Sequence, residues 1–221
     1  MDSATLGRDH YPPLSTVAKL THPIIGLTGG IAAGKSSVSR LFSQLGITVF
    51  NADHIGRTLL DPPKPAFQAI VGHYGETIVE VDGTINRRKL RHHLFTHPND
   101  RLWLESLLQP LILEQLQQSS SRYTPPPPHG YLIWEVPLLL EAGWQCYTQA
   151  IIVVDTPSSQ QLSRLCQRDQ LTEEQAQIAI ASQLSRSERL AAADYIIDNS
   201  HNESALRTQV VEIHQQLIAT L

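Results

Sequence analysis

A glycine-rich segment that ends in a lysine and two serines has the residue types and spacing of a phosphate-binding loop. From Gly29 to Ser36 it matches the pattern G-x-x-x-x-G-K-S/T without a gap. The backbone N–H groups of such a loop, together with the positive end of the following helix, bind polyphosphate. We therefore expect Lys35 to contact the β- and γ-phosphates and Ser36 to ligate Mg²⁺. The residues predicted to bind the nucleotide are Gly30, Ile31, Ala32, Ala33, Gly34, Lys35, Ser36 and Ser37.

The residues on either side of this loop supply the structural context that such a match requires. Before it, the apolar run from Ile24 to Leu27 predicts a short buried strand. After it, apolar residues recur at helical spacing as far as Gly46, which is suited to the left-handed end of a helix. We expect a strand, the loop and a helix in succession. A glycine-rich turn that binds no ligand is the alternative interpretation.

Acidic residues follow or end three other apolar runs: Asp53, Glu135 and Asp155. In an open parallel sheet, ligands bind outside the carboxyl ends of the strands, so these acids are candidate site residues. Asp53 could accept a proton from an attacking hydroxyl, help to hold Mg²⁺ through water, or cap a helix that begins at His54. Either Glu135 or Asp155 could hold the water shell of Mg²⁺, and the loop that follows favours Glu135.

Basic residues on predicted helices are candidates for binding phosphate groups. Arg164 and Arg168 are four residues apart, so both side chains project from one helix face. Two guanidinium groups on one face can clamp the transferring phosphates when the helix closes as a lid. A surface pair balanced by neighbouring acids is the alternative. Arg87 begins another basic helix, which is either an anion clamp for an acceptor substrate or a solvated helix face.

The composition of the 221 residues excludes several classes of protein. A formal net charge of −4 argues against a general nucleic-acid binder, which needs clustered Lys and Arg. No apolar run approaches the roughly 20 residues of a membrane-spanning helix. The two cysteines, Cys146 and Cys166, lack disulfide-framework or zinc spacing, which is typical of free thiols in a reducing cytoplasm. We expect a cytoplasmic monomer or weak homo-oligomer.

The order of the predicted elements divides the chain into a core, an insertion and a tail. Residues 1–22 are mixed and polar and are expected to form an N-terminal tail. Residues 23–60 and 130–221 contain the predicted strands and form an α/β core with a parallel sheet. Residues 61–129 are mainly helical and end in a Pro-rich linker. Within the core, residues from about 160 to 186 are the predicted lid.

Four separate segments of the sequence resemble one family, the dephospho-coenzyme A kinases. A phosphate-loop match alone would be weak, but these four occur in the family's order and at consistent spacing. Together they cover the chain from about Ile24 to Leu221. The segments are residues 25–36 with the glycine loop, residues 51–57 with Asn51-Ala52-Asp53, residues 135–141 with Glu135-Val136-Pro137-Leu138-Leu139-Leu140-Glu141, and residues 193–199.

The resemblance implies a P-loop NTPase fold of three α/β/α layers with a parallel sheet, a helical substrate-binding insertion and a helical lid. The reaction would be transfer of the ATP γ-phosphoryl to the ribose 3′-hydroxyl of dephospho-coenzyme A with Mg²⁺, the last step of coenzyme A synthesis. By this match Asp53 is the candidate base, Lys35 and Ser36 serve phosphate and Mg²⁺, and Arg164 and Arg168 belong to the lid. The residues implied for the acceptor are Thr28, Asp53, Arg57, Arg87, Pro137 and Leu138.

The sequence departs from the family pattern beside the predicted nucleotide. Asn51 stands where an Asp is usual, which removes one negative charge near the magnesium. Ala32 and Ala33 replace a Gly-Ser pair. Both alanines are small, so we expect the phosphate loop to be kept provided that neither must adopt a positive φ.

Two further departures lie in the predicted helices. Gln109 occupies a position where a His is expected, and Ala179 one where an Arg of the lid is expected. If that Arg contacts ATP in the family, then ATP affinity or turnover is expected to be lower here. Arg186 or Arg189 would be the substitutes for the missing side chain.

Three other functions are compatible with a phosphate loop in this context. The nearest is a kinase for another small acceptor, such as a nucleoside or a nucleoside monophosphate. A GTP-dependent switch is another, but the late strands lack the Asn-Lys-x-Asp element that recognises guanine. The third is a regulatory nucleotide-binding protein without catalysis, which Asn51 and Ala179 would favour.

Overall fold

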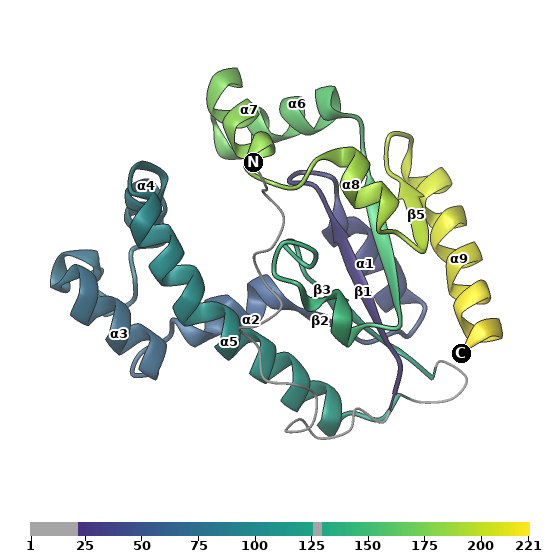
Figure 1. Ribbon diagram of the computed structural model, residues 1–221, viewed down its shortest axis with the longest axis horizontal. Helices are drawn as coiled ribbons and strands as arrows, with labels where there is room; N and C mark the ends of the chain where they lie inside the picture. The colour runs from purple at the N-terminus through teal and green to yellow at the C-terminus, as the bar shows by residue number, and fades with distance from the viewer. Residues whose placement is uncertain (1–21, 126–129) are drawn as a thin grey trace, which may run out of the picture. The chain divides into compact units, whose positions relative to one another are not determined.

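The computed structural model describes residues 22–125 and 130–221 (Figure 1). They form two compact units. The first unit contains the chain up to Asn51 together with Ser120–Leu221, and the second is Ala52–Ser119. The predicted tail, apart from its last residue, and residues 126–129 of the predicted Pro-rich linker lie outside the described residues.

The first unit is built on a five-stranded sheet in the order β2-β3-β1-β4-β5. All four pairs of neighbouring strands are parallel, which confirms the predicted α/β class with a parallel sheet. Apolar residues occupy most strand positions because a parallel sheet is covered on both faces. The strands are β1 (Ile24–Gly29), β2 (Val49–Asn51), β3 (Leu132–Glu135), β4 (Ala150–Asp155) and β5 (Tyr195–Asp198).

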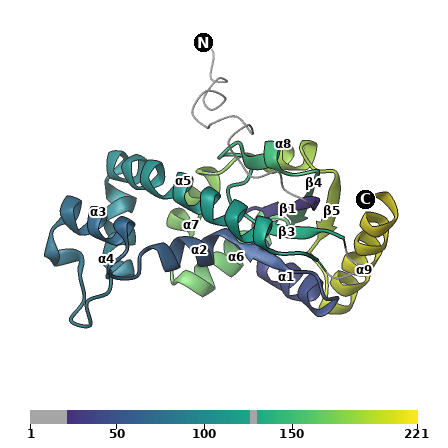
Figure 2. The ribbon, with the colours of Figure 1, turned by 90° about the horizontal axis from the view of Figure 1, so that it is seen from below.

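Helices cover both faces of this sheet. Helices α1 and α9 pack against each other on one side, whereas α8 contacts β4 on the other side (Figure 2). Helix α6 packs against α7. The helices of this unit are α1 (Lys35–Gln44), α6 (Ser158–Asp169), α7 (Glu173–Ala181), α8 (Arg186–Ala191) and α9 (Glu203–Thr220).

The main hydrophobic core lies between the sheet, α1 and α9. Alternate residues of a strand face the same side, so Ile25 and Leu27 of β1 both point into this core. Apolar residues at the helical spacing predicted from the sequence form the other side of this core. Among them, Phe42 of α1 and Val210 of α9 are fully buried. This packing fixes the carboxyl end of β1 and the start of α1, which the glycine loop joins.

The opposite face of the sheet is covered by the segment that follows β3. A Cβ on Gly26 would lie 2.6 Å from Cδ2 of Leu139, so a larger residue here would force the Leu139 side chain to shift. The buried Trp134 of β3 donates its indole N–H to the Ser120 hydroxyl at 2.8 Å. The first contact places Leu139, after β3, against β1, and the second connects β3 to the end of α5.

The second unit is helical and has a core of its own. Its elements are α2 (Ala52–Leu59), α3 (Pro65–Tyr74), the 3₁₀ turn η2 (Glu76–Ile78), α4 (Arg87–Thr96) and α5 (Pro98–Arg122), which ends in the first unit. Ile70, Ile78 and Leu90 are buried in its centre. The Asn86 side chain caps α4 by accepting a hydrogen bond from the Lys89 N–H. Among the described residues, no helix is both long and apolar enough to cross a membrane.

Candidate active site

The glycine loop joins β1 to α1 at the carboxyl edge of the sheet. Gly29 has φ 154°, and a Cβ there would lie 2.4 Å from the Val154 carbonyl oxygen, so a side chain cannot be placed. Gly34 is left-handed, with φ 94°, and directly precedes α1. The Lys35 ammonium folds back over the loop and donates to the carbonyl oxygens of Gly29 at 2.8 Å and Gly30 at 3.1 Å. The loop therefore has the strand, curl and helix start that phosphate binding requires.

Ala32 contradicts one condition of the sequence prediction. Its φ is 57°, so one of the two alanines does adopt the left-handed conformation. For an L-residue this conformation costs about 1–2 kcal/mol, whereas glycine adopts it freely. The loop is formed nevertheless, because its flanking strand and helix are fixed by the core.

Two polar residues that sequence reasoning did not single out hold the loop from the carboxyl ends of β4 and β5. Thr156, which follows β4, donates its hydroxyl to the Ala33 carbonyl at 3.0 Å. Asn199, which follows β5, donates its amide to the same carbonyl at 2.7 Å. Both could have been found by applying the rule for strand carboxyl ends to neutral as well as acidic side chains.

The structure distinguishes the two acids that the sequence left open. Asp155 ends β4 and accepts both hydrogen bonds of the Arg186 guanidinium, at 2.8 and 2.6 Å. This interaction raises the pKa of Arg186. Glu135 ends β3, is 6% exposed, and accepts hydrogen bonds from the Ser39 hydroxyl at 2.8 Å and the Asn51 amide at 2.7 Å. Its partners are neutral, so Glu135 is the acid of the two whose negative charge is not balanced by a bound arginine.

The donor set fits a hydrated magnesium ion better than a site enclosed by protein ligands. The hydroxyl of Ser36 is exposed in the first turn of α1, one turn before Ser39, the partner of Glu135. Hydroxyl and carboxylate oxygens are hard ligands, and Mg²⁺ usually keeps several waters and substrate phosphates in its shell. Among the described residues, no group of three or more His, Cys, Asp or Glu could hold a metal.

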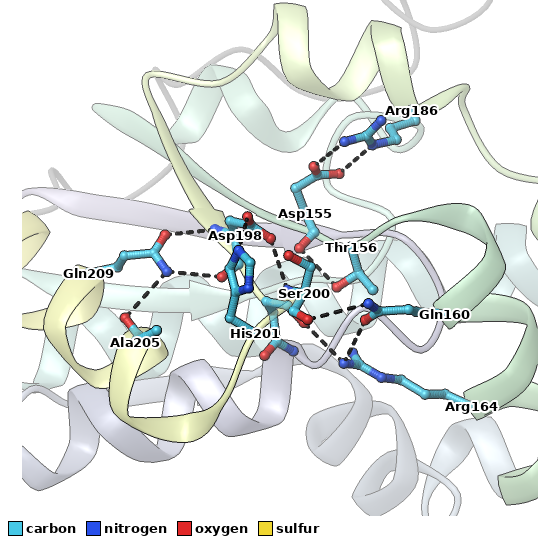
Figure 3. Close-up of polar contacts among 11 residues, drawn as sticks. Asp155, Thr156, Gln160, Arg164, Arg186, Asp198, Ser200, His201, Ala205 and Gln209 are labelled. Carbon is cyan, nitrogen blue, oxygen red and sulfur yellow. Dashed lines mark hydrogen bonds and ion pairs between the residues drawn. The ribbon is translucent and has the colours of Figure 1, made fainter.

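The two predicted lid arginines come from α6 but make different contacts. Arg164 donates to the Asn199 carbonyl at 3.0 Å and to the Gln160 side chain at 3.3 Å (Figure 3). A Cβ on Gly34 would lie 3.9 Å from Nη1 of Arg164, so this guanidinium is close to the glycine loop. Arg168 is exposed and forms an ion pair with its neighbour Asp169 at 2.8 Å.

A third arginine, Arg189 of α8, lies against the glycine loop. It is 6% exposed, and a Cβ on Gly30 would lie only 2.8 Å from its Nη2 atom. Burial lowers the pKa of this guanidinium, while Glu141 opposes the shift. Of the two possible substitutes for an arginine at position 179, Arg189 contacts the loop and Arg186 is held by Asp155.

The link between α7 and α8 also touches the loop. The Gln183 side chain accepts a hydrogen bond from the Ile31 N–H at 2.7 Å. The next residue, Leu184, donates its N–H to Glu141 at 3.1 Å and accepts from Arg189 through its carbonyl. No sequence pattern indicates Gln183, because it lies between two helices and belongs to no recognisable motif.

The residues implied for the acceptor form two contacts, one in each unit. The buried Thr28 hydroxyl donates to the Pro137 carbonyl at 3.2 Å, and Leu138 follows as a partly exposed residue. In the second unit Arg87 donates to the Arg57 carbonyl at 3.1 Å, and both side chains are at the surface.

Asp53 is exposed in the first turn of α2, two residues after Asn51. Helix α2 begins at Ala52, so the interpretation of Asp53 as the cap of a helix beginning at His54 is wrong. An acid in a first turn still interacts favourably with the helix dipole.

Comparison with known proteins identifies similar sequences over most of the chain. The family model "CoaE: Dephospho-CoA kinase" matches residues 23–205. A dephospho-CoA kinase from Salmonella paratyphi A is 42% identical over 190 residues, which are 86% of this chain and 90% of that protein. The protein of Escherichia coli K12 with the same name is 40% identical over 191 residues, 86% of this chain and 91% of its own length.

Solved structures are similar over the same extent. A dephospho-CoA kinase from Campylobacter jejuni is 26% identical, with a TM-score of 0.63 over 89% of this chain and 97% of its own. A Thermus thermophilus protein has a TM-score of 0.71 at 24% identity over 89% of this chain and 98% of its own, which shows a shared fold.

Proposed function

We propose that this chain, which belongs to the dephospho-CoA kinase family, transfers the γ-phosphoryl group of ATP to the ribose 3′-hydroxyl of dephospho-CoA. The products would be coenzyme A and ADP, which makes this the last step of coenzyme A synthesis. The observation that carries the proposal is the family match over residues 23–205, within which the loop from Gly29 to Ser36 opens α1 at the carboxyl edge of a parallel sheet.

The loop and α1 would hold the polyphosphate of ATP. The N–H groups that follow Gly30 and the positive end of α1 favour negative charge at this position. Lys35 would exchange the carbonyl oxygens of Gly29 and Gly30 for oxygens of the β- and γ-phosphates. Ser36 would ligate Mg²⁺ directly and Glu135 would hold one of its waters, and the ion would neutralise charge on the phosphates.

The remaining groups would position and activate the acceptor. Phosphoryl transfer requires little covalent work from the protein, so alignment and charge neutralisation dominate. Asp53 would accept the proton of the 3′-hydroxyl as the hydroxyl attacks. Arg164 and Arg168 would neutralise the developing charge when the helices of residues 160–186 close as a lid, and closure would exclude water.

We also infer that Ala52–Ser119, with its own core, is the unit that binds the coenzyme A precursor. Arg57 and Arg87, which share a hydrogen bond at its surface, would bind an anionic part of that substrate. The free thiols of Cys146 and Cys166 support a reducing cytoplasm as the place of action. Sedimentation of the purified protein tests the expected monomer or weak homo-oligomer.

The test of the proposed function is an acceptor comparison. Purified protein with Mg²⁺ and ATP is offered dephospho-CoA, adenosine and AMP separately, and both ATP consumption and the phosphorylated product are measured. We expect conversion of dephospho-CoA alone, with the new phosphate on the 3′-oxygen. Faster conversion of adenosine or AMP would assign another acceptor. ATP binding without conversion of any acceptor would indicate a regulatory binding protein.

A further inference from the structure

The buried carboxylate of Glu135 is held at one of its two oxygens. The Asn51 amide and the Ser39 hydroxyl both donate to Oε2, from β2 and from α1 respectively. Asn51 and Glu135 are register partners in neighbouring parallel strands, so their side chains start from adjacent positions of the sheet. The two hydrogen bonds therefore fix the carboxylate relative to two different elements.

The hydrogen-bond donors beside Glu135 determine the free-energy cost of burying its carboxylate. A carboxylate that is 6% exposed is expensive to bury unless hydrogen-bond donors replace its lost water. Asn51 supplies such a donor at 2.7 Å without adding charge. An Asp at position 51 would instead bring a second carboxylate to this distance, and like charges in a partly buried site destabilise each other.

We propose that Asn51 is a positioning residue for the magnesium site. Its amide orients the Glu135 carboxylate before any cation binds. The carboxylate is therefore already oriented to accept hydrogen bonds from the water shell of an ion bound at Ser36. This inference rests on the proposed function, because that function assigns Mg²⁺ to Ser36 and Glu135. The proposal predicts that the folded site is stable without Mg²⁺. It also predicts that the site, with one carboxylate, binds Mg²⁺ less tightly than a site with carboxylates at both positions 51 and 135 would.

The first experiment measures thermal unfolding without nucleotide, in EDTA and in millimolar Mg²⁺. The variants are Asn51→Asp, which adds the charge, and Asn51→Leu, which removes the donor at similar volume. In EDTA both should unfold about 5 °C below the native chain, since each loses a charge-assisted hydrogen bond. Mg²⁺ should restore at least about half of this loss in Asn51→Asp and almost none in Asn51→Leu, because only the former gains a metal-binding carboxylate.

A matched control makes the same substitution at an exposed helix end. Asn202 caps α9 by accepting a hydrogen bond from the Ala205 N–H, and Asp caps a helix equally well. Asn202→Asp should therefore unfold within about 1 °C of the native chain with or without Mg²⁺. An equal response to Mg²⁺ in both Asn→Asp variants would show a general charge effect and overturn the proposal.

The reciprocal double variant Asn51→Asp with Glu135→Gln tests the pairing itself. It exchanges the amide and the carboxylate between the two strands and again leaves one of each. Its unfolding temperature in EDTA should lie within about 2 °C of the native chain, whereas each single variant should be clearly lower. A double variant no more stable than Asn51→Asp alone would mean that Asn51 does not hold Glu135 and would overturn the proposal.

A kinetic measurement separates positioning from a purely structural role. With saturating ATP and dephospho-CoA, the Mg²⁺ concentration for half-maximal rate should rise about fivefold or more in Asn51→Leu and fall in Asn51→Asp, with KM for dephospho-CoA unchanged. A structural role alone would leave this concentration constant. Loss of the proposed function would appear differently, as no turnover of dephospho-CoA by the native chain while the unfolding results in Mg²⁺ still hold.

Discussion

Ala32 in the phosphate loop adopts the left-handed backbone conformation, which glycine adopts more easily. With φ 57°, this residue is left-handed, whereas the neighbouring Ala33 has no positive φ. Such a residue persists only when its surroundings determine the backbone, as the fixed ends of β1 and α1 do here. The loop therefore stores a small amount of strain next to the expected phosphates.

This strain predicts that Ala32→Gly stabilises the protein. Relief of about 1–2 kcal/mol exceeds the roughly 0.5–1 kcal/mol that glycine loses in conformational freedom, so the free energy of unfolding should rise by about 0.5–1 kcal/mol. Denaturant titration measures it. The control Ala33→Gly, at a buried position without positive φ, should be destabilised. Destabilisation of both variants would show that the left-handed Ala32 is not strained.

The role proposed for Asp53 predicts that its substitution lowers turnover but leaves ATP binding nearly unchanged. If Asp53 accepts the proton of the acceptor hydroxyl, then Asp53→Asn should lower kcat by about 10²–10⁴-fold, because general base catalysis contributes this much. The Kd of ATP, measured by calorimetry, should stay within about twofold. Asp61→Asn, at an exposed acid paired with Lys64, is the control and should keep its turnover. Native turnover in Asp53→Asn would remove Asp53 from the role of base.

The position of Arg189 against the glycine loop predicts that its substitution also lowers kinase activity. Its guanidinium is buried beside Gly30, so Arg189→Met, which keeps length and removes charge, should lower kcat/KM for ATP by about 10²-fold. Arg186→Met, which removes the ion pair with Asp155, should lower it less than about threefold. Steady-state kinetics decides between them. The opposite order would make Arg186 the arginine that serves the nucleotide in place of a side chain at position 179.

At the scale of elements, three helices of the second unit meet around one carboxylate. Asp100 of α5 interacts with His93 of α4 and, at 3.6 Å, with Nε2 of His73 of α3. His73 also stacks on Trp103, with ring centroids 3.9 Å apart. These contacts connect the ends of α3, α4 and α5 at the surface of the unit.

Asp100 predicts a dependence of stability on acid pH. Its hydrogen bond with His93 holds the pKa of this carboxyl below the ordinary 3.8 in the folded chain, so the unfolded chain takes up the proton more readily. The stabilisation is therefore complete above the ordinary pKa and is lost as the pH falls through the lowered value. Asp100→Asn should unfold with a weaker pH dependence below about pH 4. Denaturant titration across this range measures the effect. Glu76→Gln is the control, and an unchanged pH dependence in Asp100→Asn would contradict the prediction.

At the scale of the whole molecule, the two units have separate cores and are assigned different ligands. Ligand binding to the folded state slows local opening where the ligand binds. Hydrogen exchange should therefore slow in residues 30–37 with a non-hydrolysable ATP analogue and Mg²⁺, and in Ala52–Ser119 with dephospho-CoA. Protection by dephospho-CoA confined to Ser120–Leu221 would contradict the assignment of the acceptor to the helical unit.

The sequence by itself determined the features that depend on local interactions. The strand, loop and helix from Ile24 to Gln44 follow from apolar periodicity and from glycines at fixed positions. The family followed from four short segments, because their order and spacing match those of the family. Single backbone angles were beyond this reasoning, so the left-handed Ala32 and the start of α2 at Ala52 differ from expectation.

Only the tertiary structure decided which side chains meet. Glu135 and Asp155 both end apolar runs in the sequence, yet Arg186 pairs with Asp155 and Asn51 with Glu135. Asn51 and Glu135 are 84 residues apart, and their contact depends on the order of the strands and their register. Strand order and register are set by how the whole core packs, which no local pattern specifies. For this reason the phosphate loop could be predicted from the sequence, whereas the hydrogen-bond partners of the residues around it were determined only by the tertiary structure.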